Sequence, residues 1–373
     1  MFAGRGAMGE GCSLAKTKSY TDEMLNWVRG KGKILIVVHD NPDPDCLASA
    51  IALRHLFVMK LNRDATIAFS GMIGRSENIA MAKQLQIPLT PLALIDYQDF
   101  SVTCMLDTQP GAGNNSLPPD KRVDILIDHH PRREAGLRCR WDDIREEYGV
   151  TATIVYEYLQ AQDVPIGSNL ATALFYAIKS ETQDLGREAA RPDRDAYLKL
   201  FPLANKKLLY EITYPKLHVE YYLTINRAIE HSRIYGNLLA TNLQEVSFPE
   251  IVAEMADFFL RLEGVDVVLA IGRFHNEIIL SVRTSRHDVN AGTLIKRLVE
   301  GRGAAGGHGM MAGGKIEGLS DSAAELEDIE QLLVRRFIDI FALGHIRSLS
   351  LSALRRTALP ALAAEIDNLH HIV

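Results

Sequence analysis

A short segment near the start of the chain concentrates residue types that bind metal ions. Residues 39–45 read HDNPDPD, so a histidine and three aspartates fall within seven positions, and two prolines stiffen the backbone between them. Carboxylates held this close raise one another's pKa, and a divalent cation reverses that penalty. The segment therefore predicts a metal site. The alternative is a solvated acidic turn, because Asn, Pro and Asp all form turns readily.

The same segment has the alternation that begins a calcium-binding EF-hand loop, with Asn41, Asp43 and Asp45 at every second position. That loop needs glycine at its sixth position and glutamate at its twelfth. This sequence has Cys46 and Ala52 at those positions, so an EF-hand is excluded.

Two further groups of ligand-type residues each follow a short apolar run. Asp107 comes directly after the run at 102–106, and the triplet Asp-His-His at 128–130 follows the run at 123–127. A single aspartate in such a place is commonly a helix cap, and two adjacent histidines often lie on a surface. Three groups at three run ends favour one shared site instead. Its oxygen and imidazole ligands suit manganese, magnesium or a similar ion.

The elements that must position these groups are three apolar runs, at 34–38, 102–106 and 123–127. Their length, their β-branched content and the helical patterns between them predict buried strands of a parallel α/β sheet. The carboxyl ends of such strands open on one crevice, where ligands bind, so the sheet would bring the three groups together. Helices are expected beside the sheet at 47–60, 77–85, 151–160 and 168–180.

The chain of 373 residues is long enough for two or three domains. In its second half, runs at 265–271 and 277–282 predict a β-hairpin around 272–276, and a helix at 289–300 leads into the glycine-rich segment 301–309. We therefore expect an α/β protein in four parts: a parallel-sheet domain at 1–192, a helical connector at 193–233, a smaller α/β domain at 234–319 and a helical extension at 320–373.

Composition limits the kind of partner. The chain has 47% hydrophobic and 24% charged residues, and its net charge of -6 argues against a protein that wraps long nucleic acid by charge. The four cysteines form no C-x-x-C pair, which argues against a disulfide framework and fits a reducing cytoplasm. No segment has the length and apolarity of a signal peptide or a membrane span. We therefore expect a cytoplasmic protein without a membrane partner.

The order of these motifs resembles a known family. H-D-N-P-D-x-D, then Asp, then D-H-H, then G-G-H near the end resembles the DHH phosphoesterase superfamily, in the subfamily with a DHH-associated C-terminal domain. The resemblance spans about residues 33–316. This group includes nano-RNases that degrade very short oligonucleotides, phosphatases of 3'-phosphoadenosine 5'-phosphate, phosphodiesterases of cyclic dinucleotides and single-strand exonucleases. It implies a DHH domain that binds two metal ions.

The resemblance also implies a role for each motif residue. His39 and Asp43 would bind one metal ion, Asp45 and His129 would bind the other, and Asp107 would bridge the two ions. These assignments cover all three strand ends.

The resemblance also concerns Asp128, His130 and one further metal-binding position, where this sequence departs from the family. Asp128 would orient the histidines, since ligating imidazoles need a partner for their second nitrogen, and His130 would face the phosphate as a hydrogen-bond donor or acid. The family has a further metal-binding Asp in a Ser/Thr-Asp-Thr setting, where this sequence reads S-E-T at 180–182. Either Glu181 coordinates with its longer side chain, or Asp184 takes over from the next turn, or the second metal ion is held more loosely. Glu181 is slightly favoured.

In the second domain, S-V-R-T-S-R and G-G-H-G match the substrate-binding elements of the family. Arginine binds phosphate through two parallel hydrogen bonds, and glycine lets backbone N–H groups approach an anion. Taken alone, the glycine run is equally typical of a flexible linker. The predicted substrate-binding residues are Arg283, Arg286, Gly306, Gly307 and His308.

We expect hydrolysis of a phosphoester by a water bridging two divalent ions, with manganese favoured over magnesium or cobalt. Asp107 and His130 are the expected catalytic residues. Short oligonucleotides or dinucleotides are the expected substrates, because long single strands need an extended cationic groove. Cyclic dinucleotides and 3'-phosphoadenosine 5'-phosphate are alternatives. The helical tail and the family favour a homodimer.

Two other functions remain open. An inorganic pyrophosphatase uses the same metal ligands, but that branch has a lysine-rich phosphate site where this chain offers Arg and Gly-Gly-His. A non-catalytic nucleotide sensor would keep the pocket without turnover, and Glu181 in place of Asp keeps this alternative open.

Overall fold

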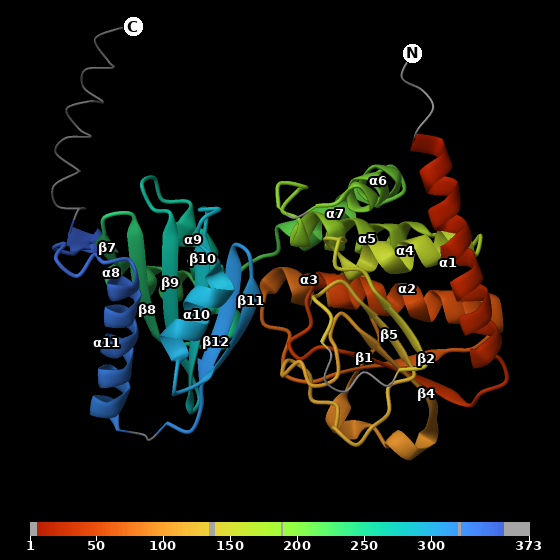
Figure 1. The fold of residues 1–373 in the computed structure, drawn as a ribbon, viewed down its shortest axis with the longest axis horizontal. Coiled ribbons are helices and arrows are strands. Elements are labelled where there is room, and N and C mark those ends of the chain that lie inside the picture. Colours follow the sequence, from red (N-terminus) through yellow and green to blue (C-terminus); the bar gives the residue numbers. More distant parts are fainter. Residues whose placement is uncertain (1–5, 134–138, 188, 320–321, 354–373) are drawn as a thin grey trace, which may run out of the picture. The chain divides into compact units, whose positions relative to one another are not determined.

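The computed structural model describes residues 6–133, 139–187, 189–319 and 322–353 (Figure 1). The chain divides into two compact units, Met1–Pro215 and Lys216–Val373. The division falls inside the segment 193–233, for which a helical connector was predicted. That segment forms three helices, of which two belong to the first unit and one to the second.

A parallel sheet of six strands forms the centre of the first unit, in the order β3-β2-β1-β4-β5-β6. This confirms the predicted parallel α/β architecture. The order reverses between β1 and β4, and ligands of open α/β sheets bind at such a switch point. The strands are β1 (Lys33–Val38), β2 (Ala65–Phe69), β3 (Leu89–Pro91), β4 (Phe100–Leu106), β5 (Ile125–Asp128) and β6 (Trp141–Ile144).

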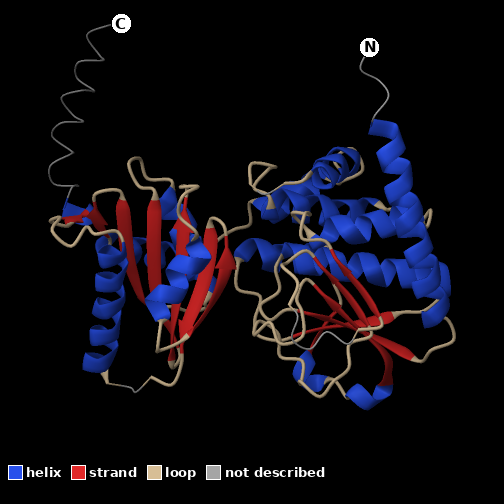
Figure 2. Cartoon of the chain, in the orientation of Figure 1, coloured by secondary structure: helices blue, strands red, loops and turns tan. Residues whose placement is uncertain are grey.

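Both faces of this sheet are covered, as parallel strands require. In β1, Ile34, Ile36 and Val38 pack in one apolar cluster with the helices, while Leu35 and Val37 pack in a second cluster on the opposite face. Figure 2 shows the long helices gathered on one side of this sheet and short helical turns on the other. The helices are α1 (Gly6–Val28), α2 (Pro44–Leu61), α3 (Ser76–Gln84), α4 (Thr151–Ala161), α5 (Ser168–Glu181), α6 (Arg191–Leu200) and α7 (Lys206–Thr213), with short 3-10 turns at Leu92–Leu94 and Tyr97–Asp99.

A mixed sheet of seven strands forms the centre of the second unit, in the order β11-β12-β10-β9-β8-β7-β13. Only β8 and β9 pair in parallel; the other pairs are antiparallel. The strands are β7 (Arg233–Tyr235), β8 (Leu238–Glu245), β9 (Val267–Phe274), β10 (Glu277–Thr284), β11 (Ala304–His308), β12 (Met311–Ile316) and β13 (Leu349–Ser350).

Helices cover both faces of this second sheet. Side chains of α10 and α11 share an apolar cluster with Val267, Leu269 and Ile271 of β9. Side chains of α8 and α9 pack with Val268 and Ala270 on the opposite face. The helices are α8 (Val219–Glu230), α9 (Glu250–Leu260), α10 (Ala291–Val299) and α11 (Ala323–Ile340).

The predicted hairpin is present, with a tighter turn than the sequence suggested. Phe274 of β9 pairs with Glu277 of β10, so the turn consists of His275 and Asn276 alone. The expected turn at 272–276 was too long because Gly272 continues the strand. Its close packing against Val246 and Val252 leaves no room for a Cβ atom there.

The glycine-rich segment 301–309 is not wholly a loop. Its second half forms the edge strand β11, which pairs with β12. A Cβ atom on Gly307 would lie 2.5 Å from Ala312, and Gly307 has φ of +134°. Glycine is therefore required there by the close approach of the two strands. The alternative of a flexible linker is therefore wrong for the residues of β11.

The helical tail predicted at 320–373 is partly described. Helix α11 occupies the beginning of this segment, whereas residues 354–373 lie outside the described part of the chain. Among the described residues, no helix is long and apolar enough to cross a membrane.

Candidate metal centre

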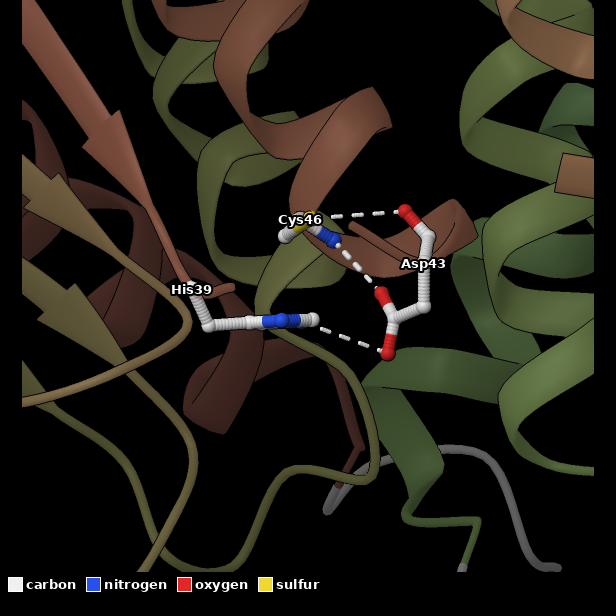
Figure 3. A group of neighbouring side chains, drawn as sticks. All are labelled: His39, Asp43 and Cys46. Atoms are coloured by element: carbon white, nitrogen blue, oxygen red, sulfur yellow. Dashed lines mark hydrogen bonds and ion pairs between the residues drawn. The ribbon is translucent and has the colours of Figure 1, made fainter. Parts of the chain in front are cut away.

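His39 and Asp43 lie on either side of a tight turn between β1 and α2 (Figure 3). Asp43 is the N-cap of α2, and its Oδ1 accepts a 3.1 Å hydrogen bond from the Cys46 amide. Its Oδ2 lies 3.4 Å from Nε2 of His39. Pro44 begins the helix, where a missing N–H costs nothing. The helix cap thus fixes Asp43 opposite the imidazole.

The imidazole of His39 is held in one orientation by its own loop. Its Nδ1 lies 2.9 Å from the carbonyl oxygen of Asp40, an atom that only accepts hydrogen bonds, so Nδ1 carries the proton. Nε2 is therefore the nitrogen that can bind metal, once it has lost its own proton. The same Nε2 lies 3.5 Å from Oδ2 of Asp107.

Asp45 lies in the first turn of α2, and its side chain is bound by the first turn of helix α4. Its side chain is 1% exposed, and its two oxygens accept 2.7 Å hydrogen bonds from the amides of Thr151 and Ala152. A helix N-terminus favours a negative charge through these free N–H groups. Nε2 of His129 lies 3.9 Å from Oδ2 of Asp45.

Asp107 follows β4 in a left-handed conformation, with φ of 59°. Its amide donates to the Ile127 carbonyl oxygen at 3.0 Å, which ties it to the neighbouring strand β5. Such a conformation is costly for a residue with a side chain and persists where surrounding contacts enforce it. The carboxylate is 2% exposed and lies between His39 and His129. This placement suits a bridging ligand, and that role stays a prediction.

His129 and His130 follow β5 and are organised by Asp128. One carboxylate oxygen of Asp128 accepts from the amides of His129 and His130 at 2.8 and 3.2 Å and from Nδ1 of His130 at 2.8 Å. Nδ1 of His129 donates to the Tyr148 carbonyl oxygen at 3.1 Å, so its Nε2 is also free to bind metal. That Nε2 lies 3.6 Å from Oδ1 of Asp107.

The charges of this centre are strongly coupled. Burial, reinforced by the charges of Asp107 and Asp43, raises the pKa of Asp45 well above its usual value. Burial disfavours the charged form of His39, but the negative groups around it, Asp43 and Asp107 among them, raise its pKa overall. A bound divalent cation would relieve the repulsion between these carboxylates, so the donor set fits a metal centre better than a solvated acidic turn.

His130 differs from the other two histidines. Burial disfavours its charged form, yet the hydrogen bond to Asp128 and the charge of Asp107 raise its pKa to about 9. Its side chain is 43% exposed. It therefore offers a proton to solvent or to a ligand at neutral pH.

Glu181 and Asp184 are placed differently. Glu181 ends α5, and burial together with the charges of Asp43 and Asp107 raises its pKa to about 7. Asp184 is 54% exposed; it accepts from Lys179 at 2.7 Å and from the Tyr197 hydroxyl at 3.0 Å. Glu181 thus lies within electrostatic reach of the carboxylates, while Asp184 is engaged elsewhere. Which of them binds metal stays a prediction.

The predicted substrate residues of the second unit lie on or just after strands β10 and β11, which are separated in the sheet by β12. Arg283 of β10 is 7% exposed, and its guanidinium donates to Asp257 at 2.7 Å and to Ser281 at 2.8 Å. Arg286, in the loop after β10, forms an ion pair with Asp288. Arg283 would have to exchange existing contacts to bind phosphate. Gly306, Gly307 and His308 belong to β11, and all five substrate roles stay predictions.

Three residues contribute to the centre but were not predicted from the sequence to do so. Cys46 stands beside the metal motif, yet was considered only as the wrong residue for a calcium loop. Thr151 binds Asp45 and Asp107 from the first turn of a helix far along the chain. Gln109 donates a 2.7 Å hydrogen bond to Asp128. Of these three residues, only Gln109 and Cys46 lie near a motif in the sequence, so only these two could have been proposed from it.

Within the described part of the chain, two groups of donors have the spacing that holds a metal ion, with ligand atoms within 4.8 Å of one another. One consists of His39, Asp43 and Cys46, and the other of Asp107, His129 and His130. The fold and these groups define an α/β protein with a candidate metal centre at the carboxyl ends of parallel strands.

Two known domain families match this chain. Residues 33–178 match the DHH family, N-terminal domain, and residues 236–337 match the DHHA1 domain. The two matches together span more than half of the chain, and the chain belongs to the DHH superfamily.

Individual proteins are also similar to this chain. Two uncharacterized proteins of Methanocaldococcus jannaschii are similar: one is 32% identical over 84% of this chain, and the other is 25% identical over 85% of it. The alignments cover 65% of the first relative and 97% of the second, so the chain spans about two thirds of the first. A crystal structure of an exopolyphosphatase-related protein from Bacteroides fragilis shares the fold, with a TM-score of 0.68 at 17% identity over 85% of this chain and 96% of that one.

Proposed function

We propose that this protein is a metal-dependent phosphoesterase that hydrolyses short oligonucleotides or dinucleotides. The observation that carries the proposal is the position of Asp107. Its two carboxylate oxygens face two different imidazoles, Nε2 of His39 at 3.5 Å and Nε2 of His129 at 3.6 Å. Both imidazoles hold Nδ1 against a backbone carbonyl oxygen, so in each ring Nε2 is the nitrogen that would bind metal once it is deprotonated. One carboxylate between two such donors supports a centre for two ions.

We assign the ligands to two sets, one for each ion. His39 and Asp43 would hold one ion and Asp45 and His129 the other, with Asp107 between them. Glu181 would complete the second set from the end of α5. Bound divalent ions lower the pKa of water and neutralise charge on a phosphoryl group. Manganese is the favoured ion for the oxygen-rich part of this set, with magnesium or cobalt as alternatives.

His130 supplies the acid in this proposal. Asp128 holds the Nδ1 proton of His130, and the raised pKa of about 9 keeps the ring charged at neutral pH. The Nε2–H of a charged ring donates a hydrogen bond to a phosphoryl oxygen or a proton to the leaving oxygen. The side chain is 43% exposed, which supports access of a substrate to the ring.

The net charge of -6 supports a small substrate over a long polyanion, which binds through many cationic contacts. A panel assay tests this. The chelated protein is supplied with manganese, magnesium or cobalt and mixed with short oligonucleotides, linear and cyclic dinucleotides, 3'-phosphoadenosine 5'-phosphate, pyrophosphate and polyphosphate. Products are separated by chromatography. Fastest turnover of linear dinucleotides or short oligonucleotides is expected, and a faster reaction of another member would replace the substrate assignment.

Asp107→Asn and Asp64→Asn form the matched pair of variants. Asp64 is 64% exposed and paired with Arg54, so its change should leave hydrolysis intact. Asp107→Asn should lower turnover more than about 100-fold, because even partners that merely orient a metal ligand contribute about 10–100-fold. If the wild type binds nucleotides but hydrolyses none of the panel, the protein is a sensor and not an enzyme.

A further inference from the structure

Cys46 lies inside the candidate metal centre, next to the two residues expected to hold the first ion. It sits in the first turn of α2 and is 0% exposed. Its Sγ, a nitrogen of His39 and a carboxylate oxygen of Asp43 lie within 4.8 Å of one another. Figure 3 shows these three side chains grouped at the start of the helix. The spacing suits three ligands around one ion.

The known contacts of this thiol do not explain its place. It approaches the carbonyl oxygen of Asp43 at 3.4 Å, and a thiol is a weak donor. Cys46 also interacts with the His39 imidazole, and it packs in the main apolar cluster of the first unit. The alternative to a ligand is therefore an inert core thiol, which behaves as a small apolar side chain.

The donor chemistry separates these alternatives. Sulfur together with imidazole nitrogen and a carboxylate oxygen is a set that zinc, iron and cobalt accept, whereas magnesium and manganese prefer oxygen ligands. The other predicted ligands, Asp45, Asp107, His129 and Glu181, contain no sulfur. The two halves of the centre therefore differ in the softness of their donors.

We propose that Cys46 is a protein ligand of the ion held by His39 and Asp43, and that this half of the centre selects zinc, iron or cobalt over magnesium and manganese. The inference deepens the proposed function by naming the metal preference of one half of the same centre. On binding, the S–H bond breaks, a sulfur–metal bond forms and the proton leaves to solvent. The second half keeps its preference for manganese or magnesium, so the occupied centre holds two different ions.

Cobalt serves as a spectroscopic probe of this sulfur. The full chain is freed of metal by chelation and titrated anaerobically with Co²⁺. A sulfur-to-cobalt charge-transfer band in the near ultraviolet is expected for the wild type. It should be lost in Cys46→Ala and kept in Cys104→Ala, because Cys104 is equally buried but lies in β4 outside both donor groups. A wild type without this band, or a band that survives in Cys46→Ala, overturns the proposal.

Zinc affinity provides a second measurement. Competition with a chromophoric chelator should show that Cys46→Ala binds zinc at least about 10-fold more weakly, since lost partners of metal ligands already cost about 10–100-fold. Manganese affinity should stay nearly unchanged. Equal losses for both metals would contradict the assignment.

X-ray absorption of the zinc-loaded wild type needs no variant and decides the matter if Cys46→Ala fails to fold. One sulfur scatterer is expected; a shell of nitrogen and oxygen alone overturns the proposal. The hydrolysis assay is independent of these readings. A sulfur signal without hydrolysis refutes the proposed function only, and hydrolysis without a sulfur signal refutes the role of Cys46 only.

Discussion

The hydroxyl of Thr151 donates a 2.8 Å hydrogen bond to Oδ1 of Asp107. The backbone amide of the same residue donates to Asp45 at 2.7 Å. Thr151 thus ties two predicted metal ligands, from the ends of different elements, to the first turn of α4. In the proposed centre, Asp45 and Asp107 contact the metal ions and Thr151 does not. Thr151 instead fixes the distance between the two carboxylates.

Thr151→Val should weaken metal binding by about 10–100-fold, because the substitution removes the hydroxyl while keeping the shape of the side chain. The amide bond to Asp45 remains. In the metal-free protein, the lost hydrogen bond should cost about 1–3 kcal/mol of unfolding free energy. Metal titration by calorimetry and urea unfolding measure the two effects.

Thr153→Val is the matched control, from the same helix. The Thr153 hydroxyl donates a 2.6 Å hydrogen bond to Asp193 and is also buried, but Asp193 belongs to neither donor group. This variant should lose similar stability with unchanged metal affinity. If the two variants lose metal affinity alike, Thr151 is not specific to the centre.

The strand-end residues could be predicted from the sequence because buried parallel strands leave a clear trace. The runs before His39, Asp107 and Asp128 each end in at least three consecutive apolar residues, and both faces of β1 are indeed buried. Strands with mixed burial left no such trace. Thr90 of β3 and Asp142 of β6 interrupt any apolar run, and neither strand was predicted.

Long-range contacts could not be predicted, for a different physical reason. Asp45 is held by backbone amides of residues 151 and 152, and every residue type except proline supplies such an amide. The glycines of β11 illustrate the reverse case. Their identity signals freedom of the backbone, but the close approach of Ala312 that requires glycine at position 307 exists only after the strands have paired.

Gln109→Met should lower turnover by about 10–100-fold with little change in KM. Gln109 is 2% exposed, and its side-chain amide donates to Asp128 at 2.7 Å while its oxygen accepts from the Arg133 amide at 2.9 Å. Without that donor, Asp128 holds His130 less firmly. Steady-state kinetics on the best substrate of the panel measure the effect.

The control for Gln109 is Gln162→Met, which also removes a buried amide. Gln162 donates to Thr21 and Asp22 at 2.7 Å each, away from the donor groups. A loss of stability without loss of turnover is expected for this variant. An unchanged turnover number in Gln109→Met would separate Gln109 from the chemistry.

Arg283 and Arg286 should respond differently to truncation. Arg283→Ala removes the partner of Asp257 from a largely buried pair, and breaking buried pairs costs about 3–5 kcal/mol. Arg286→Ala should raise KM for substrate while leaving the melting temperature nearly unchanged, because Arg286 is paired at the surface with Asp288. Thermal unfolding and steady-state kinetics of both variants provide the comparison. A raised KM in a stable Arg283→Ala would assign Arg283 to the substrate instead.

Glu181→Gln should stabilise the metal-free protein at pH 8 and weaken its metal binding. Burial and the charges of Asp43 and Asp107 raise the pKa of Glu181 to about 7 from 4.5. Below pH 4.5 the carboxyl is protonated in both the folded and the unfolded chain, and its burial then carries no charge penalty. As the pH rises through 7, the folded protein must hold a buried carboxylate and loses stability. Glutamine avoids that loss, on the order of 1–3 kcal/mol.

Metal binding has the opposite dependence on the charge of Glu181, because the ion binds the carboxylate form that the metal-free protein disfavours. At pH 6.5, the wild type should therefore release protons on binding Mn²⁺, seen as a dependence of the calorimetric heat on the ionisation enthalpy of the buffer. Glu181→Gln should release fewer protons and bind more weakly. Asp184→Asn should match the wild type in both respects, since Asp184 is engaged with Lys179 and Tyr197. If Asp184→Asn releases fewer protons and binds more weakly while Glu181→Gln matches the wild type, Asp184 is the ligand.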